Sequence, residues 1–250
     1  MLYPMLICTF AGLSTAVGAL PVVLGHKITT RKLALAQGFA AGVMLAVSVL
    51  DLLPESYGSY FVYMNSFYAF RAVASLFICG WVTGVAISGI TTTEHYTENT
   101  TVSVRRMAFI TTLVMVIHNL PEGMLTLFSS AHNIDTGIKM AVAVALHNMP
   151  EGLAIAAPVL YVTHSRGRAF MQALMAGMSE PLGALLAFFV LRPFITVHFL
   201  TGLMPVVAGI MCQAAICELI PQSLYISKIQ HSLCGIITGI IAMSIGLFVF

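Results

Sequence analysis

Eight apolar stretches, each long enough to cross a lipid bilayer, occupy most of this chain. A transmembrane helix needs about 20 predominantly apolar residues, so eight such helices leave only short connections in a chain of 250 residues. The stretches are continuous and do not alternate with period two, which predicts helices rather than the strands of a membrane barrel. We place the helices at roughly residues 2–24, 33–53, 68–90, 107–130, 137–161, 169–191, 199–222 and 232–250.

The composition supports this interpretation. Hydrophobic residues make up 59% of the chain and charged residues only 8%, whereas soluble domains carry about 25% charged residues. So few charges cannot cover the surface of a soluble enzyme. A net charge of +2 excludes a nucleic-acid partner, and the apolar content excludes disorder. We therefore predict a single all-α polytopic domain over residues 1–250, with the lipid bilayer as its surroundings.

The basic residues indicate how the chain is oriented. With the N-terminus outside, the inner loops and helix ends hold eight basic residues and the outer ones hold three, as the positive-inside rule requires. The inner set is Lys27, Arg31, Lys32, Arg105, Arg106, Arg166, Arg168 and Lys228, and the outer set is Arg71, Lys139 and Arg192. Eight spans then place both termini outside. The only sizeable polar loop, residues 91–106, is predicted to be cytoplasmic.

Two segments of the sequence occur twice. His-Asn-Leu-Pro-Glu-Gly at residues 118–123 returns as His-Asn-Met-Pro-Glu-Gly at residues 147–152. A fainter match aligns residues 41–44 and 51–56 with residues 208–211 and 218–223 in one ungapped register. On the eight-span arrangement the fourth and fifth spans are antiparallel, as are the second and seventh. Inverted repeats of this kind are typical of secondary transporters, whose substrate sites lie near the bilayer midplane.

The repeated hexapeptides carry ionisable side chains into the membrane. His118 and Glu122 are four residues apart, as are His147 and Glu151, so each pair shares one helix face. Both pairs lie about ten residues, or about 15 Å, from one end of their spans, which places them near the midplane. Imidazole and carboxylate groups from two facing helices form a set that binds divalent metals such as zinc or iron. No intramembrane lysine or arginine is available to neutralise these acids.

Further polar groups accompany the two pairs. Pro121 and Pro150 lack an N–H group and free the carbonyl four residues earlier. Asn119 and Asn148 add amide oxygens, rotated about 100° from the His/Glu face. Glu180 brings a further carboxylate in the sixth span. Together these residues predict a cation site between the spans.

Other interpretations remain for some of these residues. Histidine and glutamate also hydrogen-bond each other across kinked helices and hold a bundle together without a metal. Asp51, Glu55 and Glu218 lie at or near span ends, where structural roles compete with a place on the metal pathway. His132, near Asp135 on the outer side, is the best candidate for a site where metal first binds.

The two hexapeptides, with their neighbours, resemble the ZIP (Zrt/Irt-like) metal transporters, most closely the bacterial type. The similarity runs over essentially the whole chain. It includes Gly-Phe-Ala-Ala-Gly at residues 38–42, Leu53-Pro54, Ser-Glu-Pro-Leu-Gly at residues 179–183 and Glu-Leu-Ile-Pro at residues 218–221. The doubled hexapeptide is the specific feature.

The resemblance implies import of divalent metal into the cytosol, zinc foremost. It also implies a binuclear centre, in which the first metal is held by His118, Glu122, His147 and Glu151. The second is completed by Asn119, Asn148 and Glu180, with Glu122 and Glu151 bridging. The family suggests an elevator-like motion of spans one, four, five and six against spans two, three, seven and eight. Unlike many members, this chain has only His95 in the loop at residues 91–106, so a metal-buffering loop is not expected.

The metal is expected to be the substrate, with no separate cofactor. A ligand set that mixes nitrogen and oxygen also accepts iron, manganese, cobalt and cadmium. The alternatives are an intramembrane metalloenzyme and a metal-gated channel or sensor. The sequence lacks both His-Glu-x-x-His and Glu-x-x-His, so we do not expect an enzyme. The expected location is the plasma membrane, or the inner membrane of a bacterium, and a homodimer is a compatible assembly.

Overall fold

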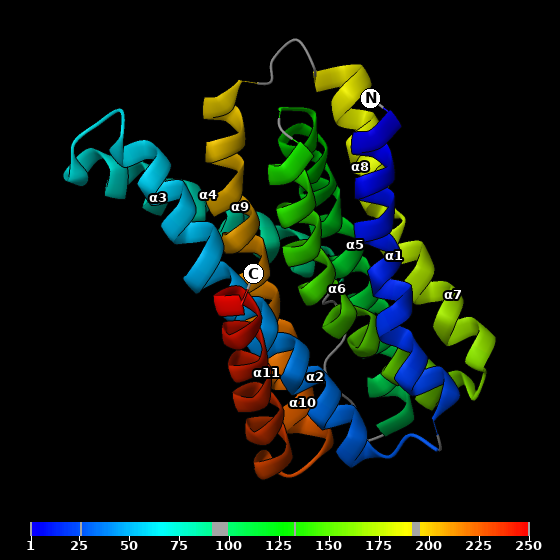
Figure 1. Cartoon of the computed structure of the whole chain (residues 1–250). Helices are drawn as coiled ribbons and strands as arrows, with labels where there is room; N and C mark the ends of the chain where they lie inside the picture. Colours follow the sequence, from blue (N-terminus) through cyan, green and yellow to red (C-terminus); the bar gives the residue numbers. More distant parts are fainter. Residues whose placement is uncertain (1, 26, 92–99, 133, 192–195, 250) are drawn as a thin grey trace.

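A computed structural model describes residues 2–25, 27–91, 100–132, 134–191 and 196–249 of the chain (Figure 1). These residues form helices joined by short connections, and none of them lies in a strand. Eight helical segments are long and apolar enough to cross a membrane. The prediction of an all-α chain with eight spanning helices is therefore confirmed.

Within the described residues, three of the eight spans contain a π-helical segment, labelled η. The spans are α1 (Leu2–Leu24); α2 (Thr30–Val47) running through η1 (Ser48–Leu52) into α3 (Leu53–Phe61); α4 (Ser66–Thr91); α5 (Thr100–His132); α6 (Ile134–Thr163); α7 (Arg166–Gly177) running into α8 (Ser179–Leu186) and η2 (Ala187–Leu191); α9 (Val197–Gln213) running through η4 (Ala214–Leu219) into α10 (Ile220–Ile226); and α11 (Ile229–Val249).

Two predicted boundaries were wrong. The second span does not end near residue 53 but continues to Phe61, since α3 extends it into a hairpin with α4. The polar loop expected at residues 91–106 is shorter, because α5 begins at Thr100; residues 92–99 lie outside the described part. The polar residues predict a loop here, but a membrane helix can continue beyond the bilayer into water. Polar side chains are well solvated there, so the helix α5 includes them.

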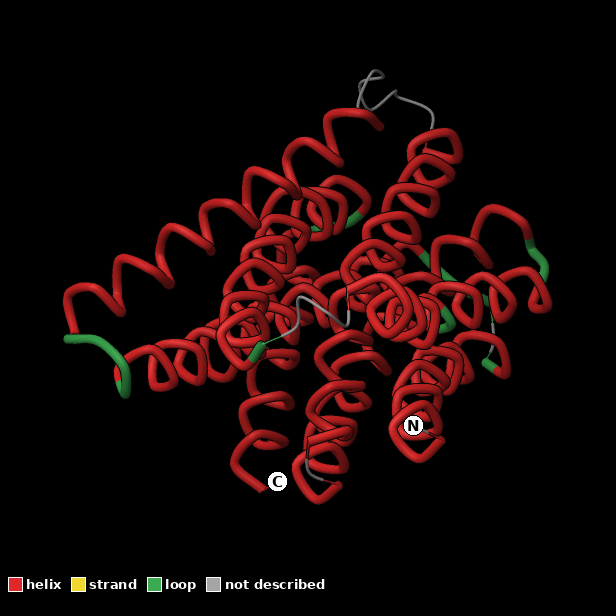
Figure 2. The backbone as a smooth tube through the Cα atoms, turned by 90° about the horizontal axis from the view of Figure 1, so that it is seen from above, coloured by secondary structure: helices red, strands yellow, loops and turns green. Residues whose placement is uncertain are grey.

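The helices pack into two groups (Figures 1 and 2). The first, which we call the α5/α6 group, contains α1, α5, α6, α7 and α8. The second, the α2/α9 group, contains α2, α3, α4, α9, α10 and α11. The most extensive packing lies within the groups, between α1 and α6, α5 and α6, α5 and α8, α2 and α11, and α4 and α9. Between the groups, α2 against α6 is the main contact.

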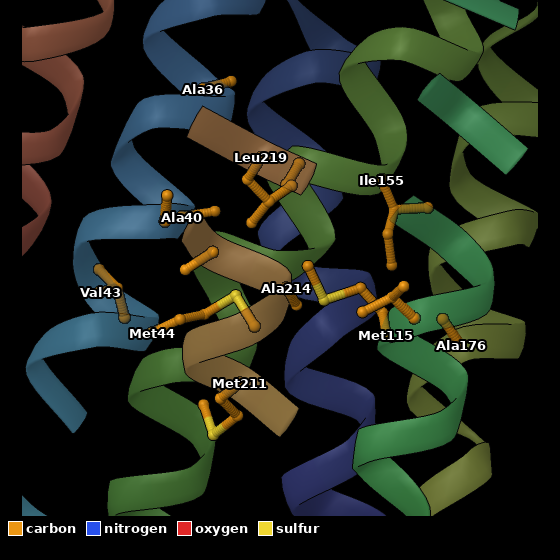
Figure 3. Packing of buried hydrophobic residues seen from close by; sticks show 14 of the residues in the cluster. Ala36, Ala40, Val43, Met44, Met115, Ile155, Ala176, Met211, Ala214 and Leu219 are labelled. Carbon is orange, nitrogen blue, oxygen red and sulfur yellow. The ribbon is translucent and has the colours of Figure 1, made fainter. Parts of the chain in front are cut away.

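One apolar core spans both groups. Small alanines and buried methionines of α2 and η4 meet the α5/α6 group there, among them Ala40, Met44 and Ala214 (Figure 3). Met44 and Met211, which occupy matching positions in the fainter sequence repeat, are both fully buried. Alanine is the most frequent residue among the buried members of this core.

Two carbonyls freed by proline receive hydrogen bonds from distant side chains. Pro158 cannot donate to the carbonyl of Ala154, four residues earlier. The buried amide of Gln37 on α2 donates to that carbonyl at 2.8 Å. In the same way, Ser56 donates at 2.9 Å to the carbonyl of Thr201, which Pro205 leaves without a helical partner. The Gln37 bond is a polar link between the two helix groups.

We expect Gln37→Leu to destabilise the protein by leaving the buried carbonyl of Ala154 without a donor, a loss of about 1–3 kcal/mol in the free energy of unfolding. Pro158→Ala restores a backbone N–H for the same carbonyl. In the Pro158→Ala background, Gln37→Leu should therefore lower the free energy of unfolding by about 1–3 kcal/mol less than it does in the wild type. Denaturant unfolding in micelles, followed by circular dichroism, measures both differences. An equal cost in the two backgrounds would show that Gln37 acts in another way.

The segments η1 and η4 lie at equivalent positions of the fainter sequence repeat. Each π-helical segment carries an acid, Asp51 in the first and Glu218 in the second, followed three residues later by proline. π-Helical turns often occur at functional sites. The repeat seen in the sequence thus extends to the backbone conformation.

Candidate metal centre

The two histidines of the repeated hexapeptides each contact the glutamate of the other hexapeptide. His118 Nε2 on α5 lies 2.9 Å from Glu151 Oε1 on α6, and His147 Nε2 on α6 lies 3.3 Å from Glu122 Oε2 on α5. All four side chains are at most 5% exposed. The histidine and glutamate of each hexapeptide are expected to share a helix face. In the structure each histidine pairs with the glutamate of the other helix.

The ring of His118 is held in one orientation. Its Nδ1 lies 3.1 Å from the carbonyl oxygen of Val114. A carbonyl only accepts hydrogen bonds, so Nδ1 carries the proton and donates. Histidines that bind metals through one nitrogen commonly donate the other to a backbone carbonyl in this way. Nε2 is then directed at Glu151.

A second polar set adjoins the crossed pairs. Asn148 donates through Nδ2 to Glu180 Oε1 on α8 and, at 3.1 Å, to the carbonyl of Ala11 on α1. The amide of Asn119 lies 3.0 Å from His118 Nε2 and 3.3 Å from Glu151 Oε2 when its nitrogen faces them. The three helices α5, α6 and α8 thus bring all seven predicted residues into one buried polar cluster.

Several acceptor atoms of this cluster are buried without a hydrogen-bond partner among the described residues. They are Glu122 Oε1, His147 Nδ1, Asn148 Oδ1 and Glu180 Oε2. A buried polar atom left unpaired costs about 1–3 kcal/mol. Glu180 also interacts electrostatically with Glu122 and Glu151, so the negative charges of these carboxylates repel one another. A cation bound among them would satisfy both the unpaired oxygens and the repulsion.

The cluster does not form a closed ligand sphere as it stands. Within the described part of the chain, no three histidine, cysteine, aspartate or glutamate side chains surround a common point at coordinating distance. The imidazoles and carboxylates are instead paired with each other. The arrangement is therefore compatible with the predicted metal centre and equally contains the interhelical hydrogen bonds that the alternative interpretation requires.

Close helix contacts hold the cluster in place. A Cβ atom at Gly123 on α5 would collide with the carbonyl of Glu180, and one at Gly152 on α6 would collide with the carbonyl of Thr15 on α1. Only glycine permits such an approach of two backbones. The last residue of each hexapeptide therefore allows α8 and α1 to pack against the cluster.

The structure places the remaining predicted residues outside the cluster. Asp51 is half-buried, Glu55 is exposed and Glu218 is 7% exposed. His132 is the last residue of α5, and its side chain lies outside the described part of the structure. Asp135 is in the first turn of α6, so the outer His132/Asp135 site stays a prediction.

Two residues of α1 beside the cluster were not predicted from the sequence. Cys8 is fully buried, and its Sγ donates to the carbonyl of Gly123 at 3.7 Å. Thr15 Oγ1 is buried without a hydrogen-bond partner among the described residues. No specific signal in the sequence marks them, since the first span also contains the hydroxyls of Thr9 and Ser14.

Comparison with known proteins identifies the family to which this chain belongs. A family model described as ZIP Zinc transporter matches residues 86–246, which include both hexapeptides and Glu180. The chain belongs to the ZIP zinc transporter family. The resemblance noted from the two hexapeptides is thereby confirmed.

Named relatives of this family cover nearly the full chain. One is the zinc transporter ZupT of Chlorobium phaeovibrioides, 35% identical over 98% of this chain and 97% of the relative. The ZupT proteins of Escherichia fergusonii, 34% identical, and Chlorobium chlorochromatii, 32% identical, align with 100% of this chain and with 97% and 98% of their own lengths. Membership of this ZIP family decides against the intramembrane metalloenzyme.

Proposed function

We propose that this protein imports divalent metal cations, zinc foremost, into the cytosol through the cluster between α5, α6 and α8. One observation carries the proposal: acceptor atoms of Glu122, His147, Asn148 and Glu180 are buried together without hydrogen-bond partners among the described residues. Family membership supports zinc as the main substrate, since the relatives are named zinc transporters. Iron, manganese, cobalt and cadmium fit the same mixed ligand set.

The donor set suggests how two metals would bind. His118, Glu122, His147 and Glu151 would hold the first when their crossed pairs open. Asn119, Asn148 and Glu180 would complete the second, with the amide of Asn119 turned so that its oxygen faces the ion. Glu122 and Glu151 would bridge the two. The hydrogen bonds of the metal-free cluster would then be exchanged for metal ligands.

Two acids, Glu55 and Asp51, lie on one side of the cluster. Glu55 is exposed and interacts electrostatically with the half-buried Asp51, which in turn interacts with His147. By the proposed orientation, this side faces outward. We assign Glu55 and Asp51 to the access path, where their charge would attract cations.

Glu218 occupies the corresponding place toward the cytoplasm. It interacts electrostatically with the charge of Arg106 and with the polar side chain of Ser88. In the proposed inverted repeat, η1 and η4 therefore flank the cluster on opposite sides, each with one acid. Glu218 is the natural candidate for the release path.

The two helix groups suggest the motion. All seven ligand residues belong to the α5/α6 group, and the apolar core that spans both groups is rich in alanine. We propose that the α5/α6 group moves as a body along the α2/α9 group and carries the metal, an elevator-like alternating access. A bacterial inner-membrane location and N-out, C-out orientation complete the proposal, and a homodimer stays a prediction.

Uptake of radioactive zinc into liposomes that contain the purified protein tests the function. We expect saturable uptake by the wild type and none by Glu151→Gln, with Glu55→Gln retaining uptake at a reduced rate. Uptake that rises without saturation would indicate a channel. Zinc bound at the cluster without any uptake would favour a sensor.

A further inference from the structure

A pocket of about 460 Å³ opens between α5, α6 and α7, away from the metal centre. Its lining combines basic and polar side chains, which we call the rim, with apolar ones, which we call the floor. The residues that matter are Arg105, Phe109, Val162, Thr163, Arg168 and Gln172. The basic residues place this end of the bundle in the cytoplasm under the proposed orientation.

The two arginines of the rim have free guanidinium groups as far as the described residues go. Arg105 and Arg168 are both exposed, and neither guanidinium makes a hydrogen bond or an ion pair with a described side chain. No carboxylate lines the pocket. Two guanidinium groups that line one pocket without a counter-charge favour a phosphate, which arginine binds in a bidentate manner.

The depth of the pocket matches the boundary between headgroups and acyl chains. Arg105 and Arg168 lie about 17 Å and about 15 Å along their helices from the middle of their spans. The spans are Val102–Ala131 and Arg166–Val190. The hydrocarbon half of a bilayer is about 15 Å thick, so both guanidinium groups reach the phosphate level.

The floor suits an acyl chain rather than water. Val159 lies about 14 Å from the middle of its span, within the hydrocarbon. Phe109 is 61% exposed on the outer surface of α5, and Val162 adds a further apolar wall. A free phosphate ion would use the rim and leave this floor uncovered.

We propose that this pocket binds one anionic phospholipid, with its phosphate between Arg105 and Arg168 and an acyl chain along Phe109 and Val162. The amide of Gln172 offers a further hydrogen bond to the headgroup. Basic pockets between transmembrane helices at the cytoplasmic face are suited to such lipids. The lipid would bind to the α5/α6 group alone and so would travel with the metal centre.

Native mass spectrometry of the purified full-length protein in neutral detergent tests the site directly. The probes are phosphatidylglycerol and phosphatidylcholine of the same acyl chains, with inorganic phosphate as a competitor. We expect the wild type to retain phosphatidylglycerol about tenfold more tightly than phosphatidylcholine, and Arg105→Gln/Arg168→Gln to lose that preference. Zinc binding, measured on the same samples, reports separately on the proposed function.

Arg31→Gln/Lys228→Gln is the matched control, because it removes two exposed basic residues at the same side but outside the pocket. It should keep the preference. Arg105→Lys/Arg168→Lys keeps the charge and the fold but loses bidentate contacts, and should weaken phosphatidylglycerol binding about threefold. Equal losses in the control, or full displacement of the lipid by equimolar phosphate, would overturn the proposal. The first would indicate a diffuse surface charge and the second a site for free anions.

Discussion

Glu151→Gln is expected to lower zinc affinity by about 100-fold or more, since partners one step removed from a metal already contribute 10–100-fold. The glutamine keeps the size of the side chain but removes its charge. In the metal-free cluster Glu151 Oε1 contacts His118 Nε2 at 2.9 Å, so the variant retains a hydrogen-bond acceptor there and should fold. Isothermal titration of zinc into the detergent-purified protein measures the change.

Glu180→Gln provides the internal comparison. Glu180 pairs with Asn148 and not with either histidine, so this variant should lose one of two bound metals while the tighter one stays. The number of zinc ions bound per chain separates the two positions. If Glu151→Gln and Glu180→Gln reduced binding to the same extent and stoichiometry, the division into two metal positions would be wrong.

Zinc binding is also expected to weaken steeply as the pH falls. Imidazole and carboxylate groups bind metal only when deprotonated, so each proton that zinc must displace lowers the apparent affinity about tenfold per pH unit. An ordinary histidine takes up its proton near pH 6.5, and two histidines belong to the proposed site. Apparent affinity should therefore fall from about pH 7 to about pH 5. Initial rates of zinc uptake at subsaturating metal follow the same trend.

The slope of the apparent zinc affinity against pH identifies the groups whose protons compete with zinc. His147→Gln removes one titrating ligand and should give a shallower dependence on pH than the wild type, at an affinity that is lower near neutral pH. Glu55→Gln, which changes an exposed acid on the proposed access path, should leave the slope unaltered. An affinity independent of pH in the wild type would contradict ligation by histidine and carboxylate.

Much of the architecture is predictable from the sequence, because the bilayer allows few solutions. Backbone groups in hydrocarbon must be paired within a helix, so long apolar runs determine the eight spans. The errors arose at the ends, where the bilayer no longer constrains the chain. The α3 extension to Phe61 and the start of α5 at Thr100 depend on contacts and solvent beyond the membrane.

The candidate ligands were also visible in the sequence, since charged side chains are costly in the membrane and proline and glycine recur beside them. The pairing of each histidine with a glutamate could not be predicted from the sequence. Residues four apart share a face, but which face meets which helix depends on how α5 and α6 pack. That packing joins His118 to Glu151 and His147 to Glu122. That Cys8 and Thr15 lie beside the cluster likewise depends on the position of α1.

The sequence by itself determined the eight spans, the identity of the buried acids and histidines, and the two repeated segments. Hydropathy and spacing are properties of one helix at a time. Only the tertiary structure decided that all seven candidate ligand residues lie on one helix group, that Gln37 of α2 donates to the carbonyl that Pro158 frees, and that two arginines border one pocket. These features depend on relative positions of separate helices, which close glycine contacts and core packing set and which no local pattern encodes.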